Sequence, residues 1–303
     1  MTIKTGNVSA LYADIVGSLV PYIEDQVLLP NASFIRNFYD ITGDSSGNTI
    51  KIPVVNAYTD AQAITEGTSI ASVGAAKNDF EPTSVSLTMS KFGSWTDITQ
   101  EAVEDASESL VRSQILARLS GGIATALDTN GFDEAATTAG TDYGQAGASG
   151  TVLETNLVMG PDSLAYGIRR APAVTHFYNN DTDSHNFRGT VRAGFKGIAA
   201  NRIAKVSSNS SIASTTHVTS LDEFQQAVSN LRKDNVDSMD GGMYAAFIGP
   251  ATEYTLVKEL NNVGASIPSL SDLGNQALLS ALLGSAVGAM FMRTNNLKSV
   301  IVA

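Results

Sequence analysis

Few residues of this chain have the types and spacing that chemistry requires. The chain has no cysteine, which excludes disulfides, thiolate zinc sites, iron–sulfur clusters and cysteine nucleophiles. The three histidines, His176, His185 and His217, are scattered and follow no metal-ligand spacing. No G-x-x-x-x-G-K-[ST] segment is present, so a P-loop is excluded. Because no nucleophile, base and orienting residue come together in the sequence, we expect a protein that is not an enzyme and holds no cofactor or metal.

Two segments imitate chemical motifs without completing them. Residues 43–47 (GDSSG) resemble the nucleophile segment of trypsin-like proteases, but no histidine is suitably placed, and a turn is the better interpretation. Residues 179–185 alternate oxygen ligands like the start of a calcium loop. They lack the glycine of the sixth position, and Thr190 stands where a bidentate glutamate is needed, so we predict a polar surface loop.

The middle of the chain is locally basic, although the whole chain is acidic. Between residues 160 and 206 there are seven Lys or Arg side chains and three Asp side chains. A polyanion is one partner for such a patch, but we favour a solvated sheet face balanced by neighbouring acids. The basic residues are Arg169, Arg170, Arg188, Arg192, Lys196, Arg202 and Lys205.

The composition predicts a folded, acidic, globular chain. Its 303 residues include 19 Lys+Arg and 30 Asp+Glu, a formal net charge of -11, with 43% hydrophobic and 16% charged residues. The negative balance argues against a clamp around nucleic acid. The N-terminus lacks the apolar core of a secretion signal, and the apolar stretch 277–292 is shorter than the roughly 20 residues that span a bilayer. We expect no membrane partner, and synthesis and folding in the cytosol.

The first third of the chain predicts an arm followed by a long excursion. Residues 1–45 read as an irregular arm, because prolines interrupt its short helical pattern. Residues 46–95 read as two extended runs with a weakly structured tip between them. Within the second run, Val85, Leu87 and Met89 alternate with polar residues, which predicts a strand with one buried face. A compact domain seldom keeps such a tip unless the tip has a partner.

A long helix is predicted over residues 98–128. Asp97 and Gln100 fit a capping box at its start, and acidic residues crowd its first turns, as the helix macrodipole favours. Apolar residues keep a helical period until Asn130-Gly131, which reads as a stop. At 1.5 Å per residue this helix would be a rod of roughly 45 Å.

Shorter helices and strands are predicted in the rest of the chain. Residues 134–150 read as a loop and residues 207–214 as a linker, and Ser220 caps a helix over 221–234. The predicted strands cover 152–159, 173–178, 190–199, 202–206 and 243–250, a further helix covers 251–262, and a last strand ends the chain.

The order of these segments resembles a known family. A strand at 51–54 (KIPV) leads into 64–68 (ITEGT), and 95–99 (WTDIT) leads into the long helix. Residues 220–260 give a helix, the strand MYAAFIGP and a second helix, and 284–295 carries glycines beside a strand. This order resembles the major capsid proteins of tailed bacteriophages, which share the Hong Kong 97-like fold.

The resemblance implies an α+β fold with four parts. These are an N-terminal arm (1–45), an extended β-hairpin or E-loop (46–95), a peripheral (P) domain (96–216) with a spine helix at 98–128, and an axial (A) domain (217–303). One departure concerns residues 157–206, which look like the block that usually closes these chains but here precede the axial-type segment. Either the chain order is permuted or one block within 134–216 belongs elsewhere.

The function implied by the resemblance is a major capsid protein that self-assembles into the icosahedral shell around phage double-stranded DNA. Its partners would be further copies in hexamers and pentamers, separate scaffolding and portal proteins, optionally a decoration protein, and packaged DNA touching the inner face without specific binding. Its location would be the virion, after assembly in the host bacterial cytoplasm. Contacts between subunits are expected at Glu66, Gly67, Lys77, Phe80, Arg169 and Arg170.

Two alternatives from other classes remain open. A β-rich surface-array or adhesin-type structural protein would carry a secretion signal, which the N-terminus does not show. A hydrolase with an unrecognised site would show a clustered set of acid and base residues, which the sequence does not show.

Overall fold

The computed structural model gives an α+β chain, and it describes residues 36–40, 48–55, 66, 82–105, 108–144, 147, 149, 151–212, 216, 218–239, 242–266, 288–297 and 299–301. The strands are β1 (Arg36–Asp40), β2 (Thr49–Val55), β3 (Pro82–Thr88), β4 (Ser90–Thr99), β5 (Val152–Met159), β6 (Leu164–Asn179), β7 (Ser184–Gly197), β8 (Ile203–Asn209), β9 (Tyr244–Ile248), β10 (Ala289–Arg293) and β11 (Ser299–Ile301). The helices are α2 (Gln100–Asp105), α3 (Glu108–Thr138), the 3₁₀ turn η2 (Ala200–Arg202), α4 (Leu221–Lys233) and α5 (Pro250–Ser266).

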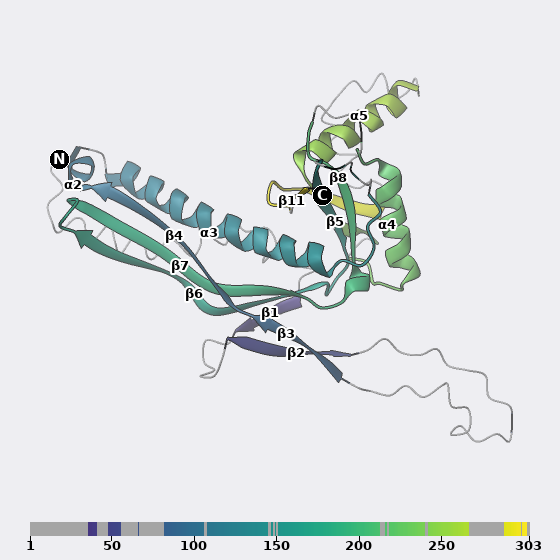
Figure 1. Ribbon diagram of the computed structural model, residues 1–303, viewed down its shortest axis with the longest axis horizontal. Coiled ribbons are helices and arrows are strands. Elements are labelled where there is room, and N and C mark those ends of the chain that lie inside the picture. The colour runs from purple at the N-terminus through teal and green to yellow at the C-terminus, as the bar shows by residue number, and fades with distance from the viewer. Residues whose placement is uncertain are drawn as a thin grey trace.

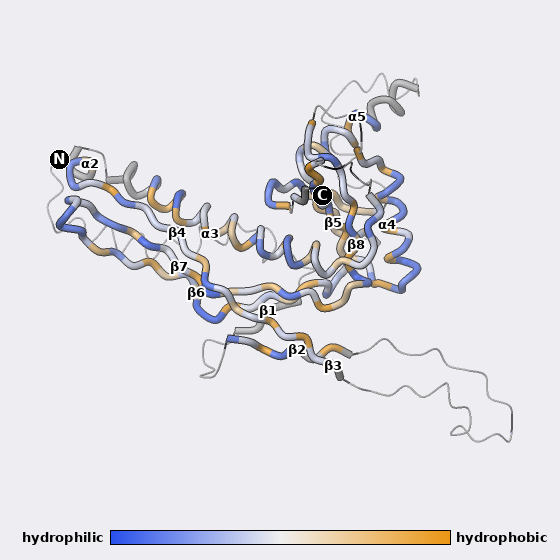
Figure 2. Tube along the Cα trace, viewed as in Figure 1, coloured by the Kyte–Doolittle hydropathy of each residue, from blue (hydrophilic) through white to orange (hydrophobic). Residues whose placement is uncertain are grey.

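A long sheet and a long helix lie together along one elongated part of the molecule (Figure 1). The sheet has the strand order β1-β6-β7-β4, in which β1 lies parallel to β6 and the other neighbours are antiparallel. Hydrophilic and hydrophobic residues both occur along β6 and β7 (Figure 2). In the outer part of β6, Ala173, Thr175 and Phe177 are exposed while Val174 is buried, as expected for a strand that buries a single face. Residues 164–167, at the other end of β6, are buried throughout. Helix α3 lies along the buried face (Figure 1), where Phe187 and Val191 of β7 pack in the core.

A second sheet, at the other end of the molecule, is buried on both faces. Its strand order is β10-β9-β5-β11, and β8 pairs with the remaining edge of β5. On β9, Ala245 and Phe247 join the core that contains α3, while Tyr244, Ala246 and Ile248 join the core under α4 and α5. Covering both faces explains why β9 is apolar throughout and does not alternate.

Helix α3 connects the two sheets through its apolar stripe. It spans 31 residues, about 46 Å at the usual rise. Leu119, Ile123 and Leu127 recur at helical spacing and are fully buried. Near its C-terminal end, Phe132 meets Phe247 of the second sheet edge to face, with ring centroids 5.1 Å apart. One continuous core therefore fixes both sheets to the same helix.

The β2–β3 hairpin lies against the face of the long sheet opposite α3 (Figure 1). Ile52, Leu87 and Met89 are almost completely buried and pack with Ala165 of β6. One polar contact adds to this anchor, because the side-chain oxygen of Asn48 accepts a 2.8 Å bond from the guanidinium of Arg192 on β7. The Asn48 carbonyl accepts a 2.9 Å bond from the Met89 backbone amide, which extends the pairing within the hairpin. The hairpin is thus held at its base.

Several predicted elements are confirmed. The strands at 152–159 and 243–250 correspond to β5 and β9, and the predicted hairpin strands correspond to β2 and β3. Ser220 precedes α4 as predicted, and its amide donates to the Glu223 carboxylate at 2.8 Å.

The prediction for the long helix was wrong at both ends. Residues 98 and 99 belong to β4, which pairs with β7. The first helical residues form the short α2, and its cap is Thr99, whose hydroxyl accepts from the Ala102 amide at 3.3 Å. Asp97 is an exposed strand residue instead. The long helix, α3, begins at Glu108 and continues through Asn130-Gly131 to Thr138, because the burial of Phe132 and Ala135 outweighs the local stop signal. The loop predicted from residue 134 therefore starts later.

The predicted domain limits also do not follow the sheets. Residues 90–95 were assigned to the extended loop, but they belong to β4 of the long sheet. The division at 216/217 cuts the second sheet, since β5 and β8 pair with each other and β5 also pairs with β9 and β11. The 157–206 block is therefore divided between the sheets, and the predicted linker at 207–214 begins as part of β8.

The described part of the N-terminal arm contains a strand that the sequence did not predict. Residues Arg36–Asp40 form β1, which adds a parallel neighbour to β6. Residues 1–35 lie outside the described residues.

The close approach between the hairpin and the long sheet gives a testable substitution. A Cβ added at Gly194 would lie 2.4 Å from the Thr88 carbonyl oxygen, so Gly194→Ala must push the hairpin base away. We expect the free energy of unfolding to fall by about 1–3 kcal/mol, measured by urea denaturation. The matched control is Gly93→Ala, where the nearest atoms are 3.4 Å away. Equal stabilities of the two variants would contradict this account of the anchor.

Candidate functional site

The face of the β4–β7–β6 sheet opposite α3 is the candidate site, and we call it the open face. Alternation along β4 places Lys91, Trp95 and Asp97 on it, because Phe92 and Ile98 between them pack toward the core. Through their register with β4, Arg188 and Arg192 of β7 share this face. Its surface beyond the hairpin base has no covering element among the described residues.

Three cations form a row across the open face. Lys91 lies directly opposite Arg192, and Arg192 lies directly opposite Arg170. Like charges in directly opposed positions destabilise a sheet. Arg192 is partly compensated by the Asn48 oxygen. Among the described residues, the ion pairs formed are Lys196–Glu134, Arg202–Asp162 and Arg293–Glu253, so no carboxylate neutralises this row. An anionic partner would offset the repulsion.

Exposed aromatic side chains stand beside the cations. Trp95, the chain's single tryptophan, is 66% exposed despite its large apolar ring. It lies opposite Arg188. The Arg188 guanidinium sits 4.4 Å from the centroid of the Phe177 ring, as in a cation–π contact. Between the cations and the aromatic residues, Gly93, Thr190 and Ala173 lie side by side in register, and their side chains are small. Exposed Trp, Phe and Arg are the residue types that protein interfaces favour.

The predicted contact residues fall into three groups. Arg170 is exposed and belongs to the cation row, while Arg169 beside it is half-buried. Glu66 is exposed in a turn. Gly67, Lys77 and Phe80 lie outside the described residues.

Arg170, Arg188 and Arg192 were predicted among the basic residues of a sheet face, whereas Lys91 and Trp95 were not predicted as members of it. The signal was present in the alternation KFGSWTD, where Lys91 and Trp95 occupy the positions between apolar residues. It was overlooked because residues 90–95 were assigned to the extended loop.

The structure corrects the description of the histidines as scattered. His176 and His185 meet at the tip of the β6–β7 hairpin, where Nε2 of His176 and Nδ1 of His185 are 3.0 Å apart. Nε2 of His185 also lies 2.7 Å from Oε1 of Gln100. Burial lowers the pKa of both imidazoles, and the charge of His185 lowers the pKa of His176 further. His217 lies outside the described residues.

The calcium-like segment is the turn between β6 and β7, in agreement with the predicted polar loop. The Asp181 amide donates to the Asn179 side chain at 3.0 Å, the Tyr178 hydroxyl donates to Asp183, and Asp183 itself has a φ of 45°. Carboxylates used in this way shape a tight turn. Across the described ranges, no group of three or more His, Asp or Glu side chains could hold a metal ion.

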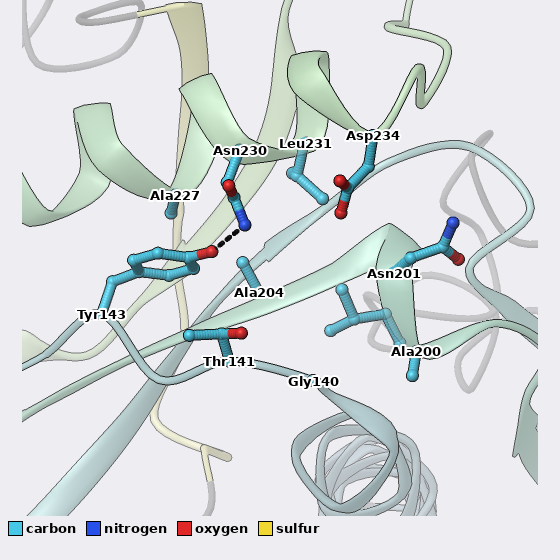
Figure 3. A pocket seen from close by; sticks show the side chains of 11 residues that line it. Gly140, Thr141, Tyr143, Ala200, Asn201, Ala204, Ala227, Asn230, Leu231 and Asp234 are labelled. Atoms are coloured by element: carbon cyan, nitrogen blue, oxygen red, sulfur yellow. Dashed lines mark hydrogen bonds between the residues drawn. The ribbon is translucent and has the colours of Figure 1, made fainter.

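A cavity of about 260 Å³ lies between α4, η2 and the segment after α3 (Figure 3). Tyr143 projects into it from the segment after α3, and its hydroxyl is bonded to the Asn230 amide (Figure 3). Asp234 is the one charged residue among those that line it. A single carboxylate among amide, hydroxyl and aliphatic groups provides no base–nucleophile pair, so the cavity offers no catalytic arrangement.

Glu154 is the most strongly perturbed acid among the described residues. Its carboxyl group is buried in the second sheet and occupies the place where a side chain of Gly249 would lie. Oε2 is buried without a hydrogen-bond partner. Desolvation raises the pKa of Glu154 from 4.5 to about 7.

The raised pKa of Glu154 predicts a loss of stability as the pH rises. The folded state binds the Glu154 proton more tightly than the unfolded state does. The stability that this proton gives the folded state is therefore fully present below pH 4.5 and is lost as the pH rises through about 7. At about pH 8, we expect Glu154→Gln to raise the free energy of unfolding by up to about 3 kcal/mol, measured by chemical denaturation. At about pH 4.5 the gain should vanish. Exposed Glu101→Gln is the control, and a gain that did not depend on pH would contradict the assignment.

No helix in the described ranges is long and apolar enough to cross a bilayer.

Comparison with known proteins finds similarity in structure only. No protein-family model and no curated protein matches the chain. The chain is similar to the capsid of bacteriophage JBD30, with 10% identity, a TM-score of 0.49 and coverage of 87% of this chain and 89% of that one. For the procapsid of the same phage the values are 12%, 0.47, 85% and 91%. For a virus-like particle from Pyrococcus furiosus they are 7%, 0.43, 64% and 98%. All three TM-scores are below 0.5.

Proposed function

We propose that the chain is a major capsid protein with the Hong Kong 97-like fold, a non-catalytic subunit that self-assembles into an icosahedral shell around phage double-stranded DNA. The observation that carries the proposal is the open face, whose cation row and exposed Trp95 are unfavourable on an isolated subunit. A neighbouring copy that covers this face removes both costs.

The anchored hairpin supports the same proposal. Strands β2 and β3 form a two-stranded sheet that is buried at its base by Ile52, Leu87 and Met89. A two-stranded ribbon has little stability of its own. The intervening segment 56–81 therefore needs a surface to lie on, and a second copy of the chain supplies one.

Charge indicates which surface receives the segment. Residues 56–81 contain four acids, Asp60, Glu66, Asp79 and Glu81, and one base, Lys77, a formal charge of -3. The open face carries four bases, Lys91, Arg170, Arg188 and Arg192, and one acid, Asp97, a formal charge of +3. We assign Glu66, Gly67, Lys77 and Phe80 to one side of this contact and Arg170 to the other, with Arg169 supporting it from β6.

The four regions of the proposed fold can be matched to the two sheets and their helices. We assign the arm to residues 1–45, the E-loop to the β2–β3 hairpin with 56–81, the P domain to α3 with β4, β6 and β7, and the A domain to the second sheet with α4 and α5. The partners proposed are further copies in hexamers and pentamers, separate scaffolding and portal proteins, optionally a decoration protein, and DNA that touches the inner face without specific binding. The shell would assemble in the host cytoplasm and persist as the virion.

Reversing charge on the open face should block assembly without unfolding the subunit. The double variant Lys91→Glu/Arg170→Glu leaves the Arg192–Asn48 anchor intact. We expect wild-type protein to give closed shells by electron microscopy, whereas the variant sediments as small species with an unchanged melting temperature. Lys233→Glu/Lys258→Glu, on exposed side chains of α4 and α5, is the control. Normal shells from the open-face variant, or monomers only from the wild type, would contradict the proposal.

Removing the tip of the hairpin tests the other side of the contact. Deletion of residues 60–80 should leave the cores of α3 and both sheets intact, since none of their described residues lies in that segment. We expect a folded subunit with cooperative unfolding that forms no shells, measured by circular dichroism and sedimentation velocity. Shells of normal size from this variant would refute the role given to the segment.

A further inference from the structure

The histidine pair is joined to the start of α2 by a chain of hydrogen bonds. His176 is on β6, His185 is on β7, and Gln100 is the first residue of α2. The two contacts measure 3.0 Å and 2.7 Å. The backbone amide of Gln100 also donates to the backbone carbonyl of Asp183 at 2.9 Å. These groups hold the tip of the β6–β7 hairpin against α2 at the far end of the long sheet (Figure 1).

The two imidazoles meet edge to edge. Their centroids are 5.2 Å apart and their planes are inclined by 18°, while the two nitrogens are 3.0 Å apart. The difference of 2.2 Å is about twice the distance from a ring nitrogen to the ring centre, so the nitrogens point at one another. This geometry is that of a hydrogen bond with one proton between the rings. It leaves no room for a metal ion between them.

The proton inventory of the pair follows from this geometry. Nε2 of His185 donates to the Gln100 oxygen, so in the neutral ring Nδ1 of His185 accepts from Nε2–H of His176. A first added proton on His176 preserves both bonds, because the imidazolium still donates from Nε2. A second proton must go to Nδ1 of His185. Two N–H groups then face each other across 3.0 Å and the bond is lost.

We propose that His176, His185 and Gln100 form a proton-operated clamp, the histidine clamp, which holds the hairpin tip to α2 and opens when both imidazoles are protonated. The clamp belongs to the single chain and does not rest on the proposed function. In a shell, the clamp would make the far end of the long sheet sensitive to acid.

The charged groups around the clamp come from four elements. Asp183, in the turn, favours protonation of His185 and opposes the effect of burial, and it is itself bonded to Tyr178 of β6. On β7, Arg188 lies over Phe177 on the open face. On β4, Asp97 shares that face through its register with Asn186, and on α2 Glu101 is exposed.

The sign of the pH dependence follows from the lowered pKa of both imidazoles. The folded state binds these protons less tightly than the unfolded state. Stability from the clamp is therefore present above the ordinary histidine pKa of about 6.5 and is lost as the pH falls below it.

Hydrogen–deuterium exchange of the full chain at different pH values tests the clamp. After correction for the intrinsic pH dependence of exchange, we expect peptides covering 100–105 and 176–187 to exchange about ten-fold faster at pH 5 than at pH 7.5. The transition should be steeper than that of a single proton, because two protons open the clamp. In His176→Gln, the amide oxygen accepts from protonated His185, so acid should no longer accelerate exchange. His217→Gln, which also removes one imidazole, should behave as the wild type.

Two results would overturn the clamp. One is exchange of these wild-type peptides that does not change between about pH 7.5 and 5, a measurement that requires no variant to fold. The other is His176→Gln following the wild-type pH curve.

Discussion

Helix α3 packs against both sheets, and this packing holds the two halves of the subunit together. Its stripe of Leu119, Ile123 and Leu127 fills the core of the long sheet, and Phe132 continues that core to Phe247 of the second sheet. The helix and one continuous core are therefore shared by the two sheets. Residues 157–206 supply strands to both sheets, so this block of sequence does not form a separate domain.

A single helix covers only one side of a sheet, and this limit creates the open face. The hairpin base covers part of the other side through Ile52, Leu87 and Met89. Beyond it, Lys91, Arg192 and Arg170 stand in register without carboxylate partners among the described residues. An isolated chain gains nothing from such a row. In the proposed shell, every subunit would offer the same face to the same neighbouring segment, so one complementary contact would be repeated throughout.

Local patterns predicted the elements whose signals are local. The alternation of Val85, Leu87 and Met89 predicted β3, and Ser220 predicted the start of α4. Signals that depend on distant partners failed. Asn130-Gly131 reads as a stop, yet the burial of Phe132 extends α3 beyond it. The approach of His176 to His185 depends on the pairing of β6 with β7, and residue spacing does not contain that information. Lys91 was not predicted beside Arg192 and Arg170, because their alignment depends on the pairing of three strands.

In the proposed shell, a neighbouring subunit covers the open face. A cryo-electron microscopy map of shells of the full chain, at side-chain resolution, would show whether it does. We expect density from residues 56–81 of an adjacent copy over Lys91, Arg192 and Arg170, with Trp95 buried beneath or beside it. Shells in which this face is exposed to solvent, with segment 56–81 elsewhere, would contradict it.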